Sequence, residues 1–474
     1  MSARRGPPLR LYALVVLSVG LLSSPGTAQP TAAGKPVAWG CRVSNWGQCT
    51  VPSDLSGVTA LSAGFAHSLG LKGDGTVVAW GCGPGTDHGQ CTVPSGLAGV
   101  IKIAAGGTHS LALKGDGTVV AWGCVGGTGG QCNVPSGLSG VIAIAAGSAH
   151  SLAAKSDGTV VAWGCGPGHD FGQCSVPSGL SGITAVAAGQ IHSLALRSDG
   201  TVVAWGCSLS FGQCSVPSGL SGVTAIAAGD VHSVALKGDG TVGAWGCGGG
   251  YNFGQCTVPG GLSGVTAIAA GYAQSLALKN DGTVVAWGCG QDSDDGQCSV
   301  PSGLTGATAI AAGVWHSLAL IVPVNQTISF GPLARKTYGD PDFTVTATAS
   351  SGLEVSFAAR GTCTVTDATV HLSGAGSCSI TASQPGNEYY NATPDVSQTF
   401  AVAPKRCRVP NVIGKRLASA KRTIARRHCR TGRVSHAYAR ARKRGLVVSQ
   451  SPRPGRAMPA RSKVNLVVSR GRRR

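Results

Sequence analysis

The chain contains cysteines in regularly repeated pairs, which could bind metal, perform redox chemistry or form disulfides. The stretch "VVAWGCGPGTDHGQCTVP" holds one pair, Cys82 and Cys91, and seven such pairs lie between Cys41 and Cys298. A zinc site needs four converging ligands, usually supplied by close cysteine pairs, whereas each unit offers two thiols, and neither His nor Asp recurs regularly in the loops. A redox centre repeated seven times is not expected either. We therefore predict no metal and no cofactor, and we expect each pair to close its own loop.

The remaining four cysteines lie in two later segments and pair within each of them. The total of 18 cysteines is even, which is typical of a disulfide framework in an oxidising compartment. The predicted disulfides are Cys41–Cys49, Cys82–Cys91, Cys124–Cys132, Cys165–Cys174, Cys207–Cys214, Cys247–Cys256, Cys289–Cys298, Cys363–Cys378 and Cys407–Cys429.

The N-terminus predicts export. Three arginines precede an apolar run over residues 11–22, and Gly26 and Ala28 are the small residues of a cleavage site. The alternative, a membrane anchor, needs about 20 apolar residues, and this run is shorter. We expect residues 1–28 to be a signal peptide and the product to be secreted, extracellular or associated with the cell wall, and not integral to the membrane.

The positive charge is concentrated at the C-terminus. The chain carries a formal net charge of +19, and residues 404–474 hold 23 of its 38 Lys and Arg but none of its 19 Asp and Glu. A basic tail in a cytosolic protein would suggest nucleic acid. For an exported protein we expect no nucleic acid, and we expect an anionic wall polymer or lipid surface as counter-ion instead.

A repeat of about 41 residues fills most of the chain. "AWGC" recurs seven times, and "AGxxHS" recurs with six histidines and one glutamine, Gln274, at the same position. One unit, residues 221–259, divides into four strand-like pieces, with "GDG" predicting a hairpin between the second and third. Four strands per unit are typical of a propeller blade. Because each end of the array holds the strands that the other lacks, we predict a closed ring of seven blades; an open solenoid is the alternative.

These residues resemble a known family. "AGxxHSLALKxDGTVVAWG" followed by "GQ" resembles the regulator of chromosome condensation repeat over residues 35–321, which implies a seven-bladed β-propeller. The fuller string "VVAWG…GQ…TVP…SGVTAIAAG…HSLALK" is similar to the secreted propeller-type β-lactamase inhibitory proteins. Both resemblances imply a binding scaffold, although a fold does not fix a function.

Successive connections of a meander alternate between its two ends, which predicts one uniform and one variable face. "AGxxHS" and "WGC…GQC" share a face and contain nearly all the variation, while "GDG" and "PSGLSG" lie opposite and hardly change. All eight aromatic residues outside the repeated tryptophans fall in the variable windows, and aromatics on rigid loops are typical anchors of interfaces. The predicted partner-binding residues are Trp46, Phe65, Phe171, Phe211, Tyr251, Phe253, Tyr272 and Trp315.

Structural alternatives apply to several of these residues. Four of the aromatics directly precede "GQC", so a purely structural role covering the ends of the blades is the alternative for Trp46, Phe171, Phe211 and Phe253. The repeated histidines indicate packing or a hydrogen bond between blades, and the repeated tryptophans indicate blade cores. We predict no catalytic residue.

Two smaller modules follow the array. Residues 325–403 alternate apolar and polar residues and resemble the Ig-like β-sandwich modules of bacterial surface proteins, which act as spacers. Residues 404–474 contain "RVPNVIG", a helical segment and "SQSPRPG", and resemble a small α+β PASTA domain, a family associated with peptidoglycan or its stem peptides. A solvated basic helix face is the alternative for this module.

The sequence thus predicts a mainly β, non-enzymatic binding protein. The propeller face would bind a protein or cell-envelope ligand, and the C-terminal domain would bind peptidoglycan or anionic wall polymer. Inhibition of a β-lactamase or penicillin-binding protein is one alternative, and a propeller-type lyase or hydrolase is another; export argues against guanine-nucleotide exchange. The only groups in the variable windows that an enzyme could use are Asp87, His88, His169, Asp170, Asp230, Asp292, Asp294 and Asp295.

Overall fold

A computed structural model describes residues 33–126, 129–208, 211–290, 293–439 and 443–472. The chain divides into two compact units at Val324 and Asn325. The predicted signal peptide, residues 1–28, lies outside the described residues. In the described part, no helix is long and apolar enough to cross a bilayer.

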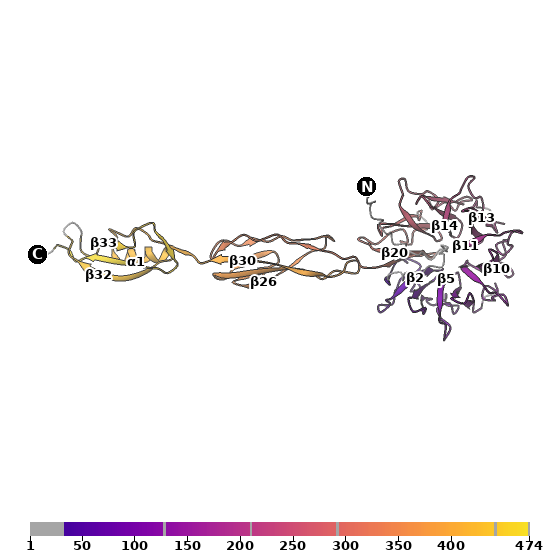
Figure 1. Ribbon diagram of the computed structural model, residues 1–474, viewed down its shortest axis with the longest axis horizontal. Helices are drawn as coiled ribbons and strands as arrows, with labels where there is room; N and C mark the ends of the chain where they lie inside the picture. Colours follow the sequence, from indigo (N-terminus) through magenta and orange to yellow (C-terminus); the bar gives the residue numbers. More distant parts are fainter. Residues whose placement is uncertain (1–32, 127–128, 209–210, 291–292, 440–442, 473–474) are drawn as a thin grey trace, which may run out of the picture. The chain divides into compact units, whose positions relative to one another are not determined.

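The first unit is built from three-stranded antiparallel sheets arranged around a common centre (Figure 1). The described residues form seven of these sheets, and each has the same order of strands. Six are continuous in sequence: β2 (Val58–Ala63), β3 (His67–Lys72), β4 (Val77–Gly81); β5 (Val100–Ala105), β6 (His109–Lys114), β7 (Val119–Gly123); β8 (Val141–Ala146), β9 (His150–Lys155), β10 (Val160–Gly164); β11 (Ile183–Ala188), β12 (Ser193–Arg197), β13 (Val202–Trp205); β14 (Val223–Ala228), β15 (Ser233–Lys237), β16 (Val242–Trp245); β17 (Val265–Ala270), β18 (Gln274–Lys279), β19 (Val284–Gly288).

The remaining sheet joins the two ends of the array. Strand β1 (Lys35–Gly40) pairs with β21 (His316–Ile321), which in turn pairs with β20 (Ala307–Ala312). Trp39 lies opposite Ser317 in this pairing, as Trp80 lies opposite Ser68 within a continuous sheet. The expected pairing of the N-terminal strand with the last strand of the array is therefore confirmed.

The prediction of a fourth strand in each unit is wrong. The "GQCTVP" segments form turns, in which the amide of Thr92, for example, donates to the carbonyl of Gly89. Proline has no amide hydrogen to donate to the hydrogen bonds of a strand pair. The backbone carbonyl of the glutamine accepts hydrogen bonds from the neighbouring sheet instead. Trp80 Nε1 and Ser68 Oγ both donate to the carbonyl of Gln48, at 3.0 and 3.3 Å. The segment after one sheet thus contacts the next sheet through side chains instead of a strand ladder.

The predicted "GDG" hairpins are confirmed. In the β6–β7 connection, Asp116 Oδ1 accepts hydrogen bonds from the amide and hydroxyl of Thr118. Gly117 has a φ of +79°, which a residue with a side chain rarely adopts. These hydrogen bonds and the nearby, half-buried Lys114 hold the pKa of the Asp116 carboxyl down at about 2.

Six buried histidines link adjacent sheets, as the repeat pattern indicated. In each link a histidine Nε2 lies 2.9 to 3.1 Å from a serine Oγ of the neighbouring sheet, and the pairs are His67–Ser110, His109–Ser151, His150–Ser193, His192–Ser233, His232–Ser275 and His316–Ser68. Each of these serine hydroxyls already donates its hydrogen to a glutamine carbonyl. The histidine Nε2 must therefore be the donor, which assigns the neutral tautomer that leaves Nδ1 without a proton.

The second unit contains two separate cores. The first lies between β22 (Ile328–Ser329), β23 (Lys336–Thr337), β24 (Phe343–Thr344), β25 (Thr348–Ala349), β26 (Ser356–Gly361), β27 (Cys363–Thr366), β28 (Thr369–Leu372), β29 (Gly376–Gln384) and β30 (Thr393–Ala403). The second lies between β31 (Arg406–Arg408), α1 (Leu417–Arg426), β32 (Arg430–Ala437), β33 (Val447–Ser451), β34 (Ala457–Pro459) and β35 (Lys463–Ser469).

The histidine links predict a strong pH dependence of stability. Burial lowers the pKa of five rings from 6.5 to about 3, and that of His192 to about 4. As the pH falls below 6.5, the unfolded chain binds protons that the folded chain excludes. Each histidine should then lower the free energy of unfolding by about 1.4 kcal/mol per pH unit. Denaturant titrations over this range measure the slope.

His192→Gln provides a matched variant, because Gln274 already occupies the equivalent position in another sheet. Removing one titrating ring should make the slope shallower by about 1.4 kcal/mol per pH unit. Gln274→Ala, which removes the uncharged side chain at the equivalent position of another sheet, should leave the slope unchanged. A stability that is constant as the pH falls from neutrality towards the lowered pKa values would contradict the assignment.

Candidate binding face

The two variable windows meet at the same end of the sheets, as predicted. The first cysteine of a disulfide loop donates its amide to the carbonyl directly before the repeated histidine, for example Cys82 to Ala66 at 2.9 Å and Cys165 to Ala149 at 3.1 Å. We call this end of the ring, formed by the "AGxx" turns and the disulfide loops, the loop face.

All nine predicted disulfides are present, and the described residues contain no free cysteine. The seven in the ring have similar geometry, with Cα–Cα distances of 6.1 to 6.3 Å. Loops of this length gain about 2.5 kcal/mol each in the chain-entropy account. The disulfides therefore hold the ends of loops that differ in sequence.

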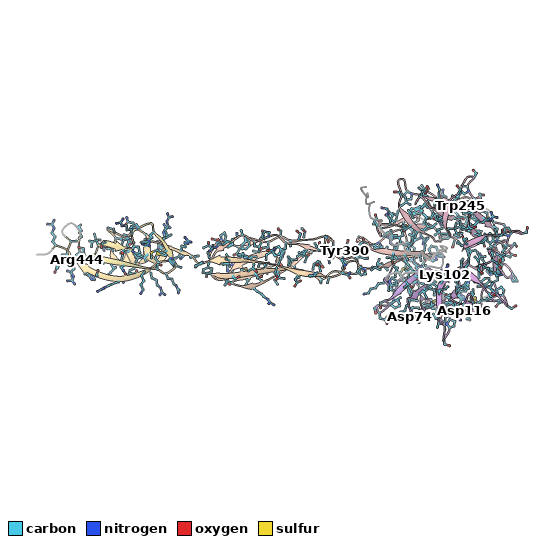
Figure 2. All side chains as sticks on the ribbon, in the orientation of Figure 1. Asp74, Lys102, Asp116, Trp245, Tyr390 and Arg444 are labelled. Carbon is cyan, nitrogen blue, oxygen red and sulfur yellow. A yellow bond between two sulfur atoms is a disulfide. The ribbon has the colours of Figure 1, made fainter. Side chains whose placement is uncertain are left out.

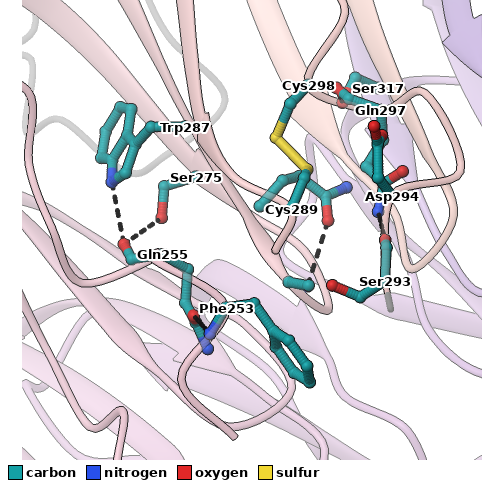
Figure 3. Close-up of a disulfide and its surroundings, with 12 residues drawn as sticks. Phe253, Gln255, Ser275, Trp287, Cys289, Ser293, Asp294, Gln297, Cys298 and Ser317 are labelled. Carbon is teal, nitrogen blue, oxygen red and sulfur yellow. Dashed lines mark hydrogen bonds between the residues drawn. A yellow bond between two sulfur atoms is a disulfide. The ribbon is translucent and has the colours of Figure 1, made fainter. Parts of the chain in front are cut away.

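A buried glutamine also restrains the disulfide loop from inside, as in the loop that contains Gln255 (Figure 3). Gln255 Oε1 accepts from the amide of Phe253 at 2.7 Å, and its Nε2 donates to the carbonyl of Tyr251 at 2.6 Å. Gln297 makes the same two contacts with Asp295 and Ser293. Each of these loops is thus fixed at its ends by a disulfide and from within by one amide.

Neighbouring loops are also joined to one another around the whole ring. An amide at the start of each loop donates to the carbonyl of the residue before "GQC" in the preceding loop, at 2.7 to 3.1 Å. The seven pairs are Arg42–Asp295, Gly83–Trp46, Val125–His88, Gly166–Gly129, Ser208–Phe171, Gly248–Phe211 and Gly290–Phe253.

The structure brings seven of the eight predicted aromatic residues into three groups. Trp46 stacks on Phe65 with ring centroids 5.6 Å apart, and Phe211 meets Tyr251 edge-on at 4.6 Å. Tyr272 lies 5.7 Å from Phe253 and 5.3 Å from Trp315. Phe65 and Tyr251 each expose 37 % of their surface. Every group therefore pairs a residue before "GQC" with one from a less regular position.

Among the described residues, Phe171 makes no ring contact with another aromatic side chain. The residues before "GQC" also bind through their backbones, since both the amide and the carbonyl of Phe171 are hydrogen-bonded. Their backbones stabilise the loops, and the rings of Trp46, Phe211 and Phe253 also support the aromatic residues beside them.

Several acidic residues of the variable windows are used structurally. Asp295 accepts hydrogen bonds from the amides of Val43 and Ser44, and Asp87 accepts from Gly89. In the described ranges no group of three His, Cys, Asp or Glu side chains is placed to hold a metal ion. Asp292 lies outside the described residues.

Sequence reasoning missed Lys102, whose side chain enters the centre of the ring (Figure 2). Lys102 Nζ donates to the carbonyl of Ile142 at 2.9 Å, and burial lowers the pKa of the amine. The sequence did contain a signal for Lys102, because the other six copies of the repeat carry alanine at this position.

The C-terminal module presents its charge to solvent. Every described Lys and Arg from Arg406 to Arg472 is exposed, including Lys421, Arg422 and Arg426 on α1. Arg444 of the same module is labelled in Figure 2. The fold beneath is fixed by the disulfide Cys407–Cys429 and by Gln450, which binds both the amide of Val412 and the carbonyl of Pro410.

Two family models match the chain. The Regulator of chromosome condensation (RCC1) repeat matches residues 58–90, 100–131, 141–173, 183–213 and 265–297, and the PASTA domain matches residues 408–470. The chain contains RCC1 repeats and a PASTA domain. The mainly β fold, with its repeated three-stranded sheets, is consistent with RCC1-like propeller blades.

Three solved structures are similar to parts of this chain, and Prp20p, with the highest TM-score of the three, agrees with the fold of the first unit. Prp20p from Saccharomyces cerevisiae is 19 % identical over 64 % of this chain and 93 % of its own, with a TM-score of 0.50. Human WBSCR16 is 18 % identical over 61 % and 98 %, with a TM-score of 0.46. The three-PASTA-domain of a Staphylococcus aureus Ser/Thr kinase is 24 % identical over 13 % and 31 %, with a TM-score of 0.13. A search of curated protein sequences finds no match.

The glutamine contacts can be tested with Gln255→Leu. This change leaves the amide of Phe253 and the carbonyl of Tyr251 without partners, and we expect it to lower the free energy of unfolding by about 1 to 3 kcal/mol. Hydrogen exchange at the Phe253 amide should accelerate. The control is Asn252→Ala, which removes one exposed contact to Gly254 and should cost less. Unchanged protection of the Phe253 amide in Gln255→Leu would contradict this role.

Proposed function

We propose that the protein is exported and acts as a non-enzymatic binding protein of the cell envelope. In this proposal the ring is a closed seven-bladed propeller whose loop face binds a protein or envelope ligand. Residues 325–403 serve as an Ig-like spacer, and residues 404–474 bind peptidoglycan or an anionic wall polymer. The observation that carries the proposal is the PASTA match at 408–470 in a chain with nine disulfides.

The disulfides support an extracellular site of action, because such bonds persist in oxidising compartments and are rare in the cytosol. Residues 1–28 supply the expected signal peptide. The loop face supports a binding role, because its aromatic groups are held by disulfides, by buried glutamines and by neighbouring loops. A surface fixed in advance loses little conformational entropy when it binds a partner.

The C-terminal module supports attachment to the envelope by two separable contributions. The fold matched by the PASTA model would provide specific recognition of peptidoglycan. The exposed basic residues would add attraction to anionic polymer, which salt screens. The two contributions are therefore distinguishable by their dependence on ionic strength.

Purified peptidoglycan, with and without its anionic polymers, tests envelope binding by co-sedimentation of the full chain. We expect the full chain to sediment with both forms and Lys421→Gln/Arg422→Gln/Arg426→Gln to lose part of its binding to the polymer-bearing form. Lys35→Gln/Lys72→Gln/Arg197→Gln removes three charges from the ring and should have no effect. If the full chain sediments with neither form, the proposed attachment is wrong.

The loop face is tested by affinity capture from envelope and secreted proteins with the full chain as bait. We expect a partner that the parent retains and that Phe65→Ala/Tyr251→Ala loses, because these two side chains are the most exposed aromatics of the face. Thr76→Ala/Thr118→Ala, on the opposite turns, is the control. A purified class A β-lactamase should be included, since its capture would identify an inhibitor. Equal capture by parent and variant would argue against the aromatic groups as the interface.

A further inference from the structure

An axial cavity opens at the centre of the loop face. It has a volume of about 150 Å³. Its wall consists of the glycines of the "AGxx" turns and of the residues that follow them, including Phe65, Ser148, Gln190, Asp230 and Val314. The turns are tied together, since the amide of Gln190 donates to the carbonyl of Asp230 and the amide of Asp230 donates to that of Gly271. The wall of the cavity is therefore part of the closed ring.

Asp230 supplies a carboxylate that has no ion-pair partner among the described residues. No side-chain hydrogen bond to this carboxylate is formed within the described ranges either. Burial raises the pKa of Asp230 to about 7. Burial, and after it the nearby charges of Asp230 and Tyr251, raises the pKa of the Tyr272 hydroxyl. A carboxylate that is removed from water and has no partner interacts favourably with a cation that enters the cavity.

The remaining lining favours one kind of cation. Phe65 and Val314 provide apolar surface, and Phe65 also has a ring face that can attract a cation. Gln190 and Ser148 also line the wall, and the side-chain carbonyl oxygen of Gln190 and the hydroxyl oxygen of Ser148 can accept hydrogen bonds from an ammonium group. This combination fits an ammonium group on a slender aliphatic stem better than a bulky or anionic ligand.

The deeper part of the channel disfavours entry of an ammonium group, which would therefore stay at the mouth. Seven alanines are shared between the mouth cavity and the next one, namely Ala63, Ala105, Ala146, Ala188, Ala228, Ala270 and Ala312. That second cavity has a volume of about 180 Å³ and is lined by Leu61, Ile103, Ile144 and the amine-bearing Lys102. An apolar wall and a like charge both disfavour further entry of an ammonium ion.

We propose that the channel mouth is a binding site for a primary ammonium group on an unbranched aliphatic stem, held by Asp230 and Phe65. Two sources share this chemistry, a lysine side chain of a protein and the free side-chain amine of a peptidoglycan stem peptide. The inference rests on the proposed binding role of the loop face and names the group that the face recognises.

Calorimetric titration of the full chain with Nα-acetyl-lysine methylamide tests the site directly. We expect millimolar binding, at Kd values of about 1 to 10 mM. The neutral analogue Nα-acetyl-norleucine methylamide should not bind. Affinity should fall as the pH drops below about 7, because a protonated Asp230 no longer attracts a cation. Equal binding of both compounds, or no binding of the lysine compound, would overturn the proposal.

Asp230→Asn should weaken binding at least tenfold, and Asp54→Asn, in a "PSDLSG" turn on the opposite face, should not change it. Asp230→Ser is a second variant that the fold should tolerate, because Ser148 occupies the same place in another repeat. Retained affinity in both Asp230 variants would reject the site. These assays use free amines, so their failure leaves the co-sedimentation result for the envelope standing.

A second arm separates the two sources of the amine. Soluble stem peptides with a free side-chain amine are compared with the same peptides after acetylation of that amine, and with lysine-bearing peptides of similar length. Tighter binding of the free-amine stem peptides would assign the site to the wall, and tighter binding of the lysine peptides would assign it to a protein partner. If acetylation has no effect on stem-peptide affinity, the stem peptide is excluded as the source.

Discussion

The ring depends on one backbone carbonyl that recurs in every unit, that of the glutamine in "GQC". It accepts the indole hydrogen of a tryptophan and the hydroxyl hydrogen of a serine, both from the next sheet, as Gln255 does for Trp287 and Ser275 (Figure 3). A strand ladder would have used this carbonyl within its own sheet. The turn frees it to join two sheets. In five units the glutamine side chain also holds the loop from within, and these glutamines are Gln48, Gln90, Gln173, Gln255 and Gln297. One residue type thus couples the packing of the sheets to the shape of the loop face.

The histidine links follow from the same contact. Because the serine hydrogen is already donated to the glutamine carbonyl, the serine oxygen can only accept, and the histidine must donate. Nδ1 of each ring then lies buried without a partner in the described structure, against the glycine of the "AGxx" turn. At Gly64, for example, an added Cβ would come within 2.8 Å of His67 Nδ1. The neutral histidines make the contacts between sheets, and protonation of these buried rings is unfavourable. Gln274 shows that an uncharged amide side chain can occupy the same position.

The sequence predicted the features that repetition makes visible. The period, the hairpins, the joined ends and all nine disulfides were readable because each appears as a regular spacing of a few residue types. The fourth strand was wrong because "QCTVP" has the composition of a strand, and composition does not reveal that Gln48 already binds Trp80 and Ser68. The sequence placed Asp230 among eight candidate groups of the variable windows, but it did not show which of them lies at the central channel, and it did not single out Lys102. Lys102 and Asp230 are each the only residue of their type at the equivalent position of the seven repeats. The first strand of each sheet and the turn that follows it come to lie around a common axis only when the sheets form the ring.

The variation on the loop face is possible because the disulfides, the repeated glutamines and the backbone hydrogen bonds between loops do not use the varying side chains. Asp295 is an exception, because its carboxylate accepts hydrogen bonds from the amides of Val43 and Ser44. Disulfide, glutamine and loop-to-loop contacts engage cysteines, one invariant amide and backbone atoms, so Phe171, His88 and Gly129 can occupy equivalent positions with the same carbonyl contact. Each loop can therefore change its exposed residue without loss of the ring. The aromatic groups and the Asp230 cavity are departures from this repeat, and none of the contacts that close the ring requires those side chains. A face on which the unusual residues gather while the opposite face stays uniform is the arrangement expected when recognition is confined to one end of a rigid scaffold.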